Sequence, residues 1–354
     1  MATILIVGAG MMGSALAVPI ADRGHTVRIV GSPLDRDIIS SLKSQRLHPK
    51  LRLELPSSIE PFFDDELERA AHDVDAIAFG VSSAGITWAC GAVGPIIRPA
   101  TPLFMITKGL VVEGGNVVTL PDAVKARLPA SVASSIHPAA IAGPCIAGEI
   151  ARKVPTCVVL AGRDRPSLER IAQWIETPYY RPLVTTDVVG AEVCAALKNA
   201  YAMGIAFPAG MHERGGGTAG SVAMHNLESA IMAQAVLEMR RLVRVLGGKP
   251  ESASGLPGVG DLDVTTNGGR TGRFGRLLGL GLSRNEAIEK MEGATLECLE
   301  ILAIVRDAFA SRAIDDVLTN YPLLDHLAAV ALDGAPVDVP MSRFFGPELT
   351  GDSA

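Results

Sequence analysis

Residues 1–14, Met1-Ala-Thr-Ile-Leu-Ile-Val-Gly-Ala-Gly-Met-Met-Gly-Ser14, combine the features of a strand, a tight turn and a helix start. The apolar run Ile4–Val7 predicts a buried strand, and Gly8, Gly10 and Gly13 follow it in the spacing G-x-G-x-x-G. Gly8 permits the turn, Gly10 lets the backbone approach a pyrophosphate, and Gly13 lets the helix pack closely on the strand. A helix N-terminus also offers N–H groups to phosphates. The stretch predicts dinucleotide binding, and the alternative is a glycine-rich turn in another α/β protein.

The composition is that of an ordinary globular protein with room for two domains. The chain has 354 residues, of which 48% are hydrophobic and 20% are charged, so each domain could bury its own core. The net charge is −6, so we expect no general attraction to nucleic acid or to an anionic membrane. An anionic substrate would have to be bound by locally placed lysine and arginine.

The cysteines and the apolar segments indicate a cytoplasmic protein without a metal. The 5 cysteines are scattered and show no C-x-x-C spacing, which favours a reducing compartment and no zinc site. The N-terminus lacks the basic region of a signal peptide. The apolar segment 195–211 contains Lys198 and Pro208, so it does not resemble a membrane span. The histidines show no metal-binding spacing.

Alternating strands and helices predict a doubly wound, parallel sheet in the first half of the chain. We expect strands at 26–30, 75–81, 102–106, 132–136 and 158–160, and helices near 64–71 and 87–97. Ligands bind beyond the carboxyl ends of such strands. Gly8–Gly13, Ser82-Ser83, Lys108 and Gly143-Pro144 all follow predicted strands. We therefore expect them to line one cleft.

The end of the second predicted strand bears on the choice of cofactor. An acidic residue there would hold the 2′-hydroxyl of NAD, whereas a serine tolerates the 2′-phosphate of NADP. The strand ends at Gly31-Ser32-Pro33, without an acid at the expected position. Ser32 is therefore a candidate cofactor contact, and the sequence favours NADP weakly over NAD. Asp35 could still reach this point.

Helical patterns dominate the chain after residue 188. We expect helices at 189–211, 226–246, 273–280, 283–290, 295–308 and 314–332. This pattern predicts a dinucleotide-binding domain over residues 1–188, a helical substrate and catalytic domain over 189–345, and a loose tail over 346–354. The glycine-rich segment 210–225 is predicted to be a flexible insertion, either a surface loop or a lid.

Lys198-Asn199 is the feature most suggestive of catalysis. A charged lysine in an apolar helical segment is costly to bury unless it is paired, and such a lysine suits general acid–base chemistry. The alternative is a structural lysine whose stem packs on the core while its charge reaches solvent. Lys108, at a strand end, offers a second cation, although it could also be an ordinary surface residue.

Two further motifs indicate a site for a phosphorylated substrate. The glycines of 255–262 predict a tight loop that presents Asp261, which could orient Lys198; the alternative is a helix cap. The segment Thr265–Phe274 combines hydroxyls, glycines and Arg270 before a predicted helix, as a phosphate site requires. It could instead be a capped helix with solvent-facing arginines.

These motifs together predict hydride transfer to a phosphorylated carbonyl compound. A serine hydrolase is disfavoured because no G-x-S-x-G elbow occurs. The sequence resembles the NAD(P)-dependent sn-glycerol-3-phosphate dehydrogenase family. The motifs that carry the resemblance are Gly8–Gly13, Thr107–Leu110, Gly143–Glu149 with Pro155-Thr156, Glu192–Asn199, Gly255–Leu262, Gly268–Arg270 with Arg273–Gly275, and Glu292-Gly293.

The resemblance implies a Rossmann domain followed by an all-helical domain, and the reversible reduction of dihydroxyacetone phosphate to sn-glycerol 3-phosphate. Lys198 would then be the proton donor and acceptor, with Asp261 and Lys108 as further catalytic residues. The implied substrate-binding residues are Lys108, Gly143, Asn199, Thr265, Gly269, Arg270 and Thr271. The implied cofactor-binding residues are Gly8, Gly10, Met11, Met12, Gly13, Ser32, Lys108, Ala147, Arg270 and Glu292. Helical domains of this kind often pair, so we expect a homodimer.

The chain departs from the family pattern at three places. Thr271 follows the phosphate-binding arginine where the family usually has asparagine, the insertion at 210–225 is longer, and the segment 48–56 lacks the usual tyrosine. These departures leave open the same chemistry on a larger polyol or ketose phosphate. A nucleotide-sensing protein that has lost catalysis and a dehydrogenase of 3-hydroxy acids are the remaining possibilities.

Overall fold

The computed structural model describes residues 1–114, 116–221, 224–310 and 320–346. Contacts within the chain divide it into two compact units. The first unit comprises Met1–Gly109 and Thr119–Val188, and the second comprises Leu110–Val118 and the chain from Val189 onward. The short segment 110–118 thus belongs with the helical unit and not, as its place in the sequence predicted, with the dinucleotide-binding domain. In the described part of the chain, no helix is both long enough and apolar enough to span a membrane.

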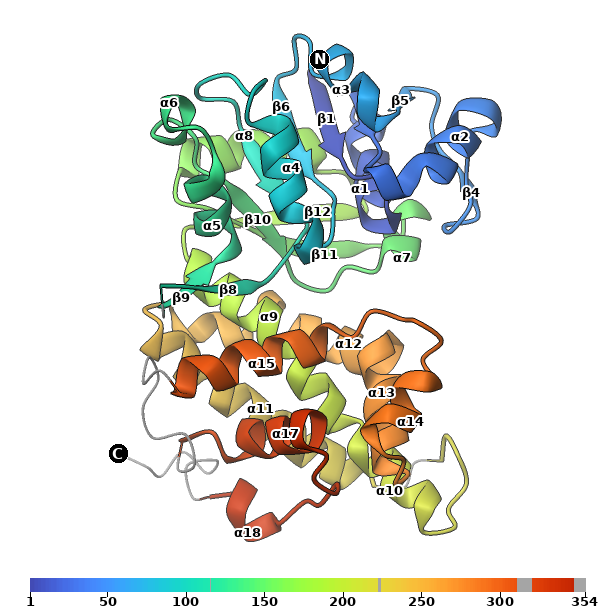
Figure 1. Ribbon diagram of the computed structural model, residues 1–354, viewed down its shortest axis with the longest axis vertical. Helices are drawn as coiled ribbons and strands as arrows, with labels where there is room; N and C mark the ends of the chain where they lie inside the picture. Colours follow the sequence, from blue (N-terminus) through green and yellow to red (C-terminus); the bar gives the residue numbers. More distant parts are fainter. Residues whose placement is uncertain (115, 222–223, 311–319, 347–354) are drawn as a thin grey trace. The chain divides into compact units, whose positions relative to one another are not determined.

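A mostly parallel sheet forms the centre of the first unit (Figure 1). Among the described residues, its eight strands are β12 (Tyr180–Thr185), β11 (Thr156–Ala161), β10 (Ala139–Ala142), β7 (Leu103–Met105), β6 (Ala76–Phe79), β1 (Thr3–Val7), β2 (Thr26–Val30) and β5 (Ile59–Phe62), in that spatial order. All neighbouring strands are parallel except β10 and β11. Two small sheets pair β3 (Leu47–His48) with β4 (Leu53–Glu54), and β8 (Leu110–Glu113) with β9 (Asn116–Thr119).

The central strand β1 is apolar because both of its faces are covered. The residues from Ile4 to Val7 are all 0% exposed, as expected for a strand with helices on both sides of the sheet. The helices and helical turns of this unit are α1 (Met11–Asp22), η1 (Pro33–Asp35), α2 (Arg36–Gln45), η2 (Asp64–Glu66), α3 (Leu67–Ala70), η3 (Ser83–Gly85), α4 (Ile86–Val93), α5 (Leu120–Arg127), α6 (Ala130–Ala133), α7 (Ala147–Ala151) and α8 (Arg165–Ile175). Helix α1 contacts α7 and α8, whereas α4 contacts α5. The crossovers from β1 to β2 through α1 and from β6 to β7 through α4 advance in opposite directions along the sheet, so the right-handed rule for such crossovers places α1 and α4 on opposite faces.

Three predictions for this unit are wrong in detail. The expected strand at 132–136 is instead the short helix α6 and a turn, because Pro129 immediately precedes a helical start, and the strand β10 begins only at Ala139. The sheet is not wholly parallel, because β10 and β11 pair in antiparallel fashion. The helix expected at 64–71 is divided into η2 and α3.

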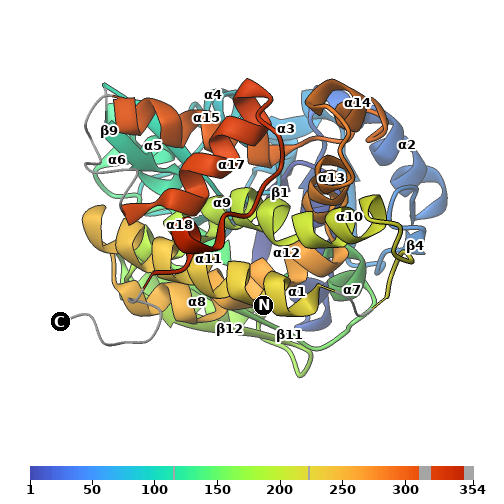
Figure 2. The same cartoon turned by 90° about the horizontal axis from the view of Figure 1, so that it is seen from below.

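The second unit is a set of packed helices (Figure 2). Within its described residues, the helices and helical turns are α9 (Val188–Ile205), α10 (Phe207–Arg214), α11 (His225–Val245), η4 (Pro250–Ser254), η5 (Leu256–Gly260), α12 (Asp261–Gly268), α13 (Arg270–Gly279), α14 (Arg284–Glu289), α15 (Glu297–Ala310), α17 (Pro322–Asp333) and α18 (Met341–Phe344). Helix α17 contacts both α15 and α11. The large side chains of Tyr201, Phe207 and Phe274 are fully buried in its core. The helix expected at 314–332 falls partly outside the described residues, as does the tail expected at 346–354.

Glycines bring α13 directly against the backbone of α9 and α10. A Cβ at Gly275 would lie 2.0 Å from the carbonyl oxygen of Met203, and one at Gly279 would lie 2.3 Å from that of Phe207. Both distances are too short for any side chain. The absence of side chains at these two positions therefore sets the depth at which α13 packs, and with it the place of Arg270 at the start of that helix.

The glycine-rich segment begins later than the sequence indicated. Helix α10 continues to Arg214, so the first residues of the expected insertion at 210–225 are helical. After this helix, the backbone of Gly217 lies against the imidazole of His212. Nε2 of that ring is 2.9 Å from the hydroxyl oxygen of Ser221. Residues 222 and 223 lie outside the described residues.

Candidate functional site

The predicted dinucleotide turn is built from glycines that are in direct backbone contact. Gly8 has φ +110°, and a Cβ there would lie 2.7 Å from backbone atoms of Gly80 and Val81. A Cβ at Gly13 would lie 2.2 Å from the carbonyl oxygen of Gly8. The turn therefore fits only because Gly8, Gly13 and Gly80 all lack side chains. Sequence reasoning missed Gly80, although a glycine directly after an apolar strand was a usable signal.

Gly10 differs from these glycines because a Cβ there would make no close contact. It is the N-cap of α1, and the nearest atom to a Cβ there would be the Gly80 carbonyl oxygen, at 4.0 Å. The first turn of α1 contains no acidic residue. Met11 is 46% exposed at the start of the helix, whereas Met12 is partly buried against the core of the unit. The N-terminus of α1 thus has the room and the N–H groups that a phosphate needs.

An acidic side chain does reach the end of β2. Asp35 Oδ2 accepts hydrogen bonds from the Ser32 hydroxyl (2.7 Å), the Ser32 N–H (2.9 Å) and the Ala9 N–H (3.2 Å). Ser32 is also the N-cap of η1. The carboxylate therefore links the end of the second strand to the glycine turn, even though no acid occupies the strand end itself.

Contacts join the other predicted strand ends of the first unit at the same edge of the sheet. The Thr107 hydroxyl donates to the Val81 carbonyl oxygen at 2.5 Å, and Lys108 Nζ donates to the Gly143 carbonyl oxygen at 3.1 Å. Gly143 itself has φ +113°. Ala147 is the first residue of α7, which packs on α1. The loops after β6, β7 and β10 thus meet as the topology predicted.

Lys198 and Asp261 form an ion pair in the second unit. Nζ of Lys198, on α9, lies 2.5 Å from Oδ1 of Asp261, and the two side chains are 13% and 2% exposed. Asp261 is the first residue of α12 and follows the π-helical turn η5. That turn is tight because Gly258 approaches the backbone of Ala253 so closely that a Cβ would lie 2.0 Å from its carbonyl oxygen. Asn199 is half-buried next to the lysine on α9.

Lys198 and Asp261 are both largely withdrawn from water, where an unpaired charge is costly. Each side chain therefore stabilises the ionised form of the other. The helical pattern around Lys198 explains its position, since Leu197 and Ala200 are buried on either side of the Lys198-Asn199 pair. A lysine in this setting is oriented by a carboxylate and remains partly open to solvent.

The predicted phosphate motif has a different local structure from the one expected. The segment is helical on both sides of Gly269: α12 extends to Gly268, and Gly269 alone separates it from α13. The Thr265 hydroxyl donates to the Asp261 carbonyl oxygen of its own helix at 2.6 Å. Thr271 is 3% exposed in the first turn of α13. The helix predicted at 273–280 therefore begins earlier, at Arg270, which lies in the first turn of α13.

Arg270 begins α13 and pairs with a residue that sequence reasoning did not select. Its Nη2 lies 2.8 Å from Oε1 of Glu297, with the two side chains 53% and 37% exposed. Glu297 is the first residue of α15. Glu292 lies in the turn after α14 with φ +53° and an exposed side chain. The guanidinium of Arg270 is accessible to an anion in competition with the Glu297 carboxylate.

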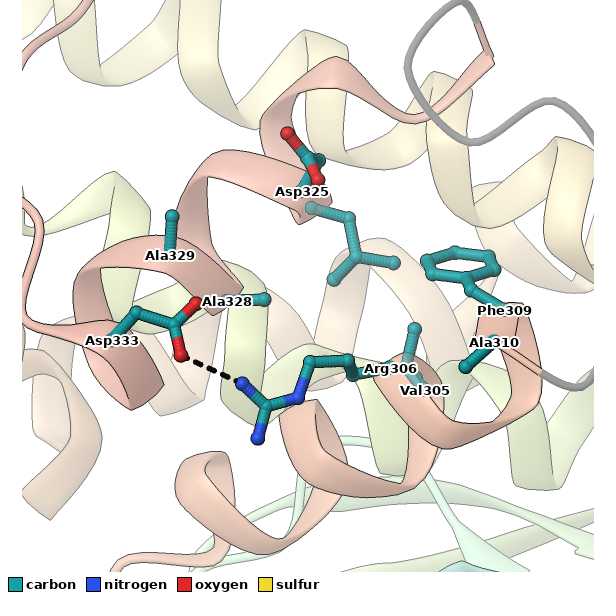
Figure 3. Close-up of a pocket in the computed structure, with 9 residues that line it drawn as sticks. Val305, Arg306, Phe309, Ala310, Asp325, Ala328, Ala329 and Asp333 are labelled. Atoms are coloured by element: carbon teal, nitrogen blue, oxygen red, sulfur yellow. Dashed lines mark hydrogen bonds and ion pairs between the residues drawn. The ribbon is translucent and has the colours of Figure 1, made fainter.

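A separate pocket of about 400 Å³ lies between α15 and α17, and no predicted site residue lines it. Figure 3 shows the ion pair of Arg306 and Asp333 at this pocket, together with the ring of Phe309. The described residues contain no group of three or more histidine, cysteine, aspartate or glutamate side chains placed to hold a metal ion.

A strand, glycine turn and helix of this geometry, combined with a helical unit that contains a buried lysine–aspartate pair, define a Rossmann-type nicotinamide-nucleotide dehydrogenase. The particular family follows from comparison with known proteins. The chain belongs to the NAD-dependent glycerol-3-phosphate dehydrogenase family: residues 3–167 match the N-terminal part of that family and residues 187–342 match its C-terminal part. The resemblance inferred from the sequence motifs is thereby confirmed.

Relatives match over nearly the whole chain. The NADP(+)-dependent glycerol-3-phosphate dehydrogenase of Archaeoglobus fulgidus is 36% identical over 335 residues, covering 95% of this chain and 96% of the relative. The glycerol-3-phosphate dehydrogenase [NAD(P)+] of Shouchella clausii is 31% identical, with 90% and 92% covered. The crystal structure of glycerol-3-phosphate dehydrogenase from Coxiella burnetii superimposes with a TM-score of 0.78 at 27% identity, covering 94% of this chain and 95% of that one. The predicted fold class, a Rossmann domain followed by a helical domain, is also confirmed.

Proposed function

We propose that this protein catalyses the reversible reduction of dihydroxyacetone phosphate to sn-glycerol 3-phosphate with NAD(P)H. The single observation that carries the proposal is the buried ion pair between Lys198 and Asp261, 2.5 Å apart, in a chain of the glycerol-3-phosphate dehydrogenase family. Reduction of a ketone consumes one hydride and one proton, so the site must supply a proton donor next to the carbonyl oxygen.

The first unit has the properties needed to bind the cofactor. No atom crowds Gly10, since the nearest atom to a Cβ there would be 4.0 Å away, and the first turn of α1 carries no acidic residue to repel a pyrophosphate. When bound, the nicotinamide supplies the hydride to the carbonyl carbon. We propose that Gly8, Gly10 and Gly13 form the pyrophosphate turn. Met11, Met12, Ser32, Lys108, Ala147, Arg270 and Glu292 complete the proposed cofactor contacts.

Lys198 is proposed to give its proton to the carbonyl oxygen of the substrate. The ammonium loses one proton from Nζ as the oxygen becomes a hydroxyl, and the resulting amine regains a proton from solvent. In the reverse direction the neutral amine takes the hydroxyl proton. Asp261 stabilises and orients the ammonium. The 13% exposure of the lysine side chain leaves a route by which the proton is replaced.

The phosphate of the substrate is proposed to bind at Arg270. A guanidinium binds phosphate through two parallel hydrogen bonds, and the N-terminus of the ten-residue helix α13 adds further donors. Because Arg270 is paired with Glu297, the incoming phosphate competes with this carboxylate. Lys108, Gly143, Asn199, Thr265, Gly269 and Thr271 are the other proposed substrate contacts.

NADP is proposed to be preferred over NAD. The strand end carries Ser32 and not an acid, and the Archaeoglobus relative is named as NADP(+)-dependent. Asp35 already accepts three hydrogen bonds from Ser32 and Ala9. We also propose that the protein is a homodimer, and that it works in the cytoplasm, because its cysteines are few and scattered without pairing motifs.

The first experiment follows nicotinamide absorbance with dihydroxyacetone phosphate and either NADH or NADPH. Rapid oxidation supports the proposed function, and the ratio of the two rates reports the cofactor preference. If the folded protein binds a cofactor but oxidises none, the proposal is wrong for this substrate. Four- and five-carbon ketose phosphates then test the larger substrates suggested by Thr271, and silence with all of them favours a nucleotide-sensing protein.

A further inference from the structure

Ala9 stands between Gly8 and Gly10 of the dinucleotide turn and is held by side chains at both of its peptide groups. Its carbonyl oxygen accepts from the hydroxyl of Ser14 at 3.1 Å and lies 3.1 Å from Nε2 of His48. Ala9 and His48 are both 0% exposed. His48 comes from the β3–β4 hairpin, far from the turn in sequence, so this contact is formed by the tertiary fold.

The surroundings of His48 determine its tautomer. The N–H of Leu51 donates to Nδ1 at 3.1 Å, so Nδ1 is an acceptor and carries no proton. The proton of the neutral imidazole is therefore on Nε2, which donates it to the Ala9 carbonyl oxygen. A doubly protonated ring would direct a second N–H at the N–H of Leu51, so the site suits only the neutral form.

The opposite side of Ala9 is held by an acid. Its N–H donates to Oδ2 of Asp35 at 3.2 Å. Two flanking glycines, one of them at φ +110°, give this turn more backbone freedom than other residues would. Side chains that fix Ala9 from both sides reduce that freedom, and they hold the first N–H groups of α1 in one direction.

We propose that His48 is a positioning residue of the dinucleotide site, which acts by holding the Ala9 carbonyl oxygen so that the glycine turn is ready for the pyrophosphate. This inference rests on the proposed function of that turn. Burial lowers the pKa of His48, which keeps the ring neutral. The charge of Lys50, on its own hairpin, acts in the same direction, and that of Asp35 opposes it.

Two conservative substitutions separate the two hydrogen bonds of the ring. The amide nitrogen of glutamine reaches the position of Nε2, so His48→Gln keeps a donor for Ala9. The amide oxygen of asparagine occupies the position of Nδ1, so His48→Asn keeps an acceptor for Leu51 and loses the donor for Ala9. His48→Ala loses both. The variants therefore distinguish support of the turn from support of the hairpin.

The test is a fluorescence titration of each purified variant with NADPH, together with its melting temperature and its kinetics with dihydroxyacetone phosphate. We expect the Kd for NADPH to rise about tenfold in His48→Asn and in His48→Ala, the effect of one lost hydrogen bond, and to stay close to wild type in His48→Gln. The KM for dihydroxyacetone phosphate and the kcat at saturating NADPH should not change.

Two results would overturn the inference. Either the Asn variant binds NADPH as tightly as the wild type, or the Gln variant loses as much affinity as the Asn variant, which would indicate that the hairpin matters and the Ala9 contact does not. The proposed function fails differently. In that case the folded wild-type protein itself binds neither NADPH nor NADH, or binds them without reducing any ketose phosphate.

Discussion

Nζ of Lys198 and Oδ1 of Asp261 are 2.5 Å apart, and the aspartate side chain is only 2% exposed. Two charges withdrawn from water lose hydration free energy, and their mutual attraction offsets this loss only in part. Stability alone is therefore a weak reason for the pair. Its geometry is better suited to catalysis, since a carboxylate orients an ammonium whose side chain remains 13% open to solvent.

Replacing Lys198 should abolish most of the turnover. We expect Lys198→Met to reduce kcat by about two or more orders of magnitude, because the proton donor is lost. The change also leaves the buried carboxylate of Asp261 without its cation, which costs about 3–5 kcal/mol of stability, so the melting temperature must be measured too. Lys290→Ala, at an exposed lysine of the same unit, is the control. A folded Met variant within about tenfold of wild type would exclude the proposed role.

Arg270 should affect the binding of substrate more than the chemical step. Arg270→Ala removes a bidentate phosphate contact, so we expect KM for dihydroxyacetone phosphate to rise by about tenfold or more. Glu297→Gln should leave the KM for dihydroxyacetone phosphate unchanged or lower than in wild type, because the carboxylate that competes with phosphate for Arg270 is gone. Arg273→Ala, three residues further along α13, serves as the control. Unchanged KM and kcat in Arg270→Ala would place the phosphate elsewhere.

The sequence predicted those features that depend on neighbouring residues. The spacing of the glycines identified the dinucleotide turn, and the apolar pattern around Lys198 indicated a helix with a buried charge. The strand predicted at 26–30 has the same bounds in the structure. In each case a local pattern carries the physical cause, since glycine conformation and side-chain periodicity are both set within a few residues.

Features formed by residues distant in sequence were missed because no local pattern indicates them. Gly80 is needed only because it meets Gly8 and Gly13, and Glu297 reaches Arg270 from another helix. The β8–β9 pair at 110–119 was overlooked although Gly114 marks its turn with φ +59°. A run such as 132–136 favours a strand by composition, but the preceding Pro129 starts a helix instead. Local propensity is overridden where a cap or a tertiary contact favours another conformation.

Ser32→Asp should shift the cofactor preference toward NADH. A carboxylate at the strand end repels the 2′-phosphate of NADPH and accepts the 2′-hydroxyl of NADH. In this chain the new carboxylate would also adjoin Asp35, which now accepts the Ser32 hydroxyl at 2.7 Å, so two like charges would meet. Ser32→Ala controls for loss of that hydrogen bond alone. The ratio of kcat/KM for the two cofactors is the measurement, and a ratio equal to that of Ser32→Ala would show that this position does not distinguish the cofactors.

Gly275→Ala should destabilise the helical unit. Its Cβ would lie 2.0 Å from the Met203 carbonyl oxygen. The Cβ is fixed on the backbone of α13 and the oxygen belongs to the backbone of α9, so neither can rotate away and the helices must separate. We expect a loss of about 1–3 kcal/mol or more in urea unfolding. Gly91→Ala is the matched control, since a Cβ at that helical position meets nothing within 4 Å; it should be neutral or slightly stabilising. Equal stability of the two variants would mean that α13 does not pack at the stated depth.

The carboxylate of Glu238 should make the stability of the helical unit depend on pH. It is 0% exposed and accepts from the N–H groups of Leu323 (2.8 Å) and Leu324 (3.0 Å) at the start of α17, from Gln234 (2.9 Å) and from the Tyr201 hydroxyl (3.0 Å). Burial outweighs these hydrogen bonds and raises the pKa of Glu238 from 4.5 to about 7. Between these two values the folded protein holds a proton that the unfolded chain has released.

The free energy of unfolding should therefore contain a contribution that is complete below the unfolded pKa and declines as the pH rises toward 7, with a total of about 3 kcal/mol. Glu238→Gln cannot ionise, so its unfolding free energy should lack this slope. Its amide nitrogen cannot accept a hydrogen bond from a backbone N–H of α17, which lowers the stability of the variant relative to wild type at acidic pH. Urea unfolding at about pH 5 and about pH 8 measures the difference, with Glu251→Gln at an exposed glutamate as the control. Since the ionised form of Glu238 is the one penalised, the stability of the Gln variant relative to wild type should rise by up to about 3 kcal/mol between about pH 5 and about pH 8. Parallel pH profiles for the two proteins would show that the four hydrogen bonds keep Glu238 ionised throughout and that burial does not control its proton.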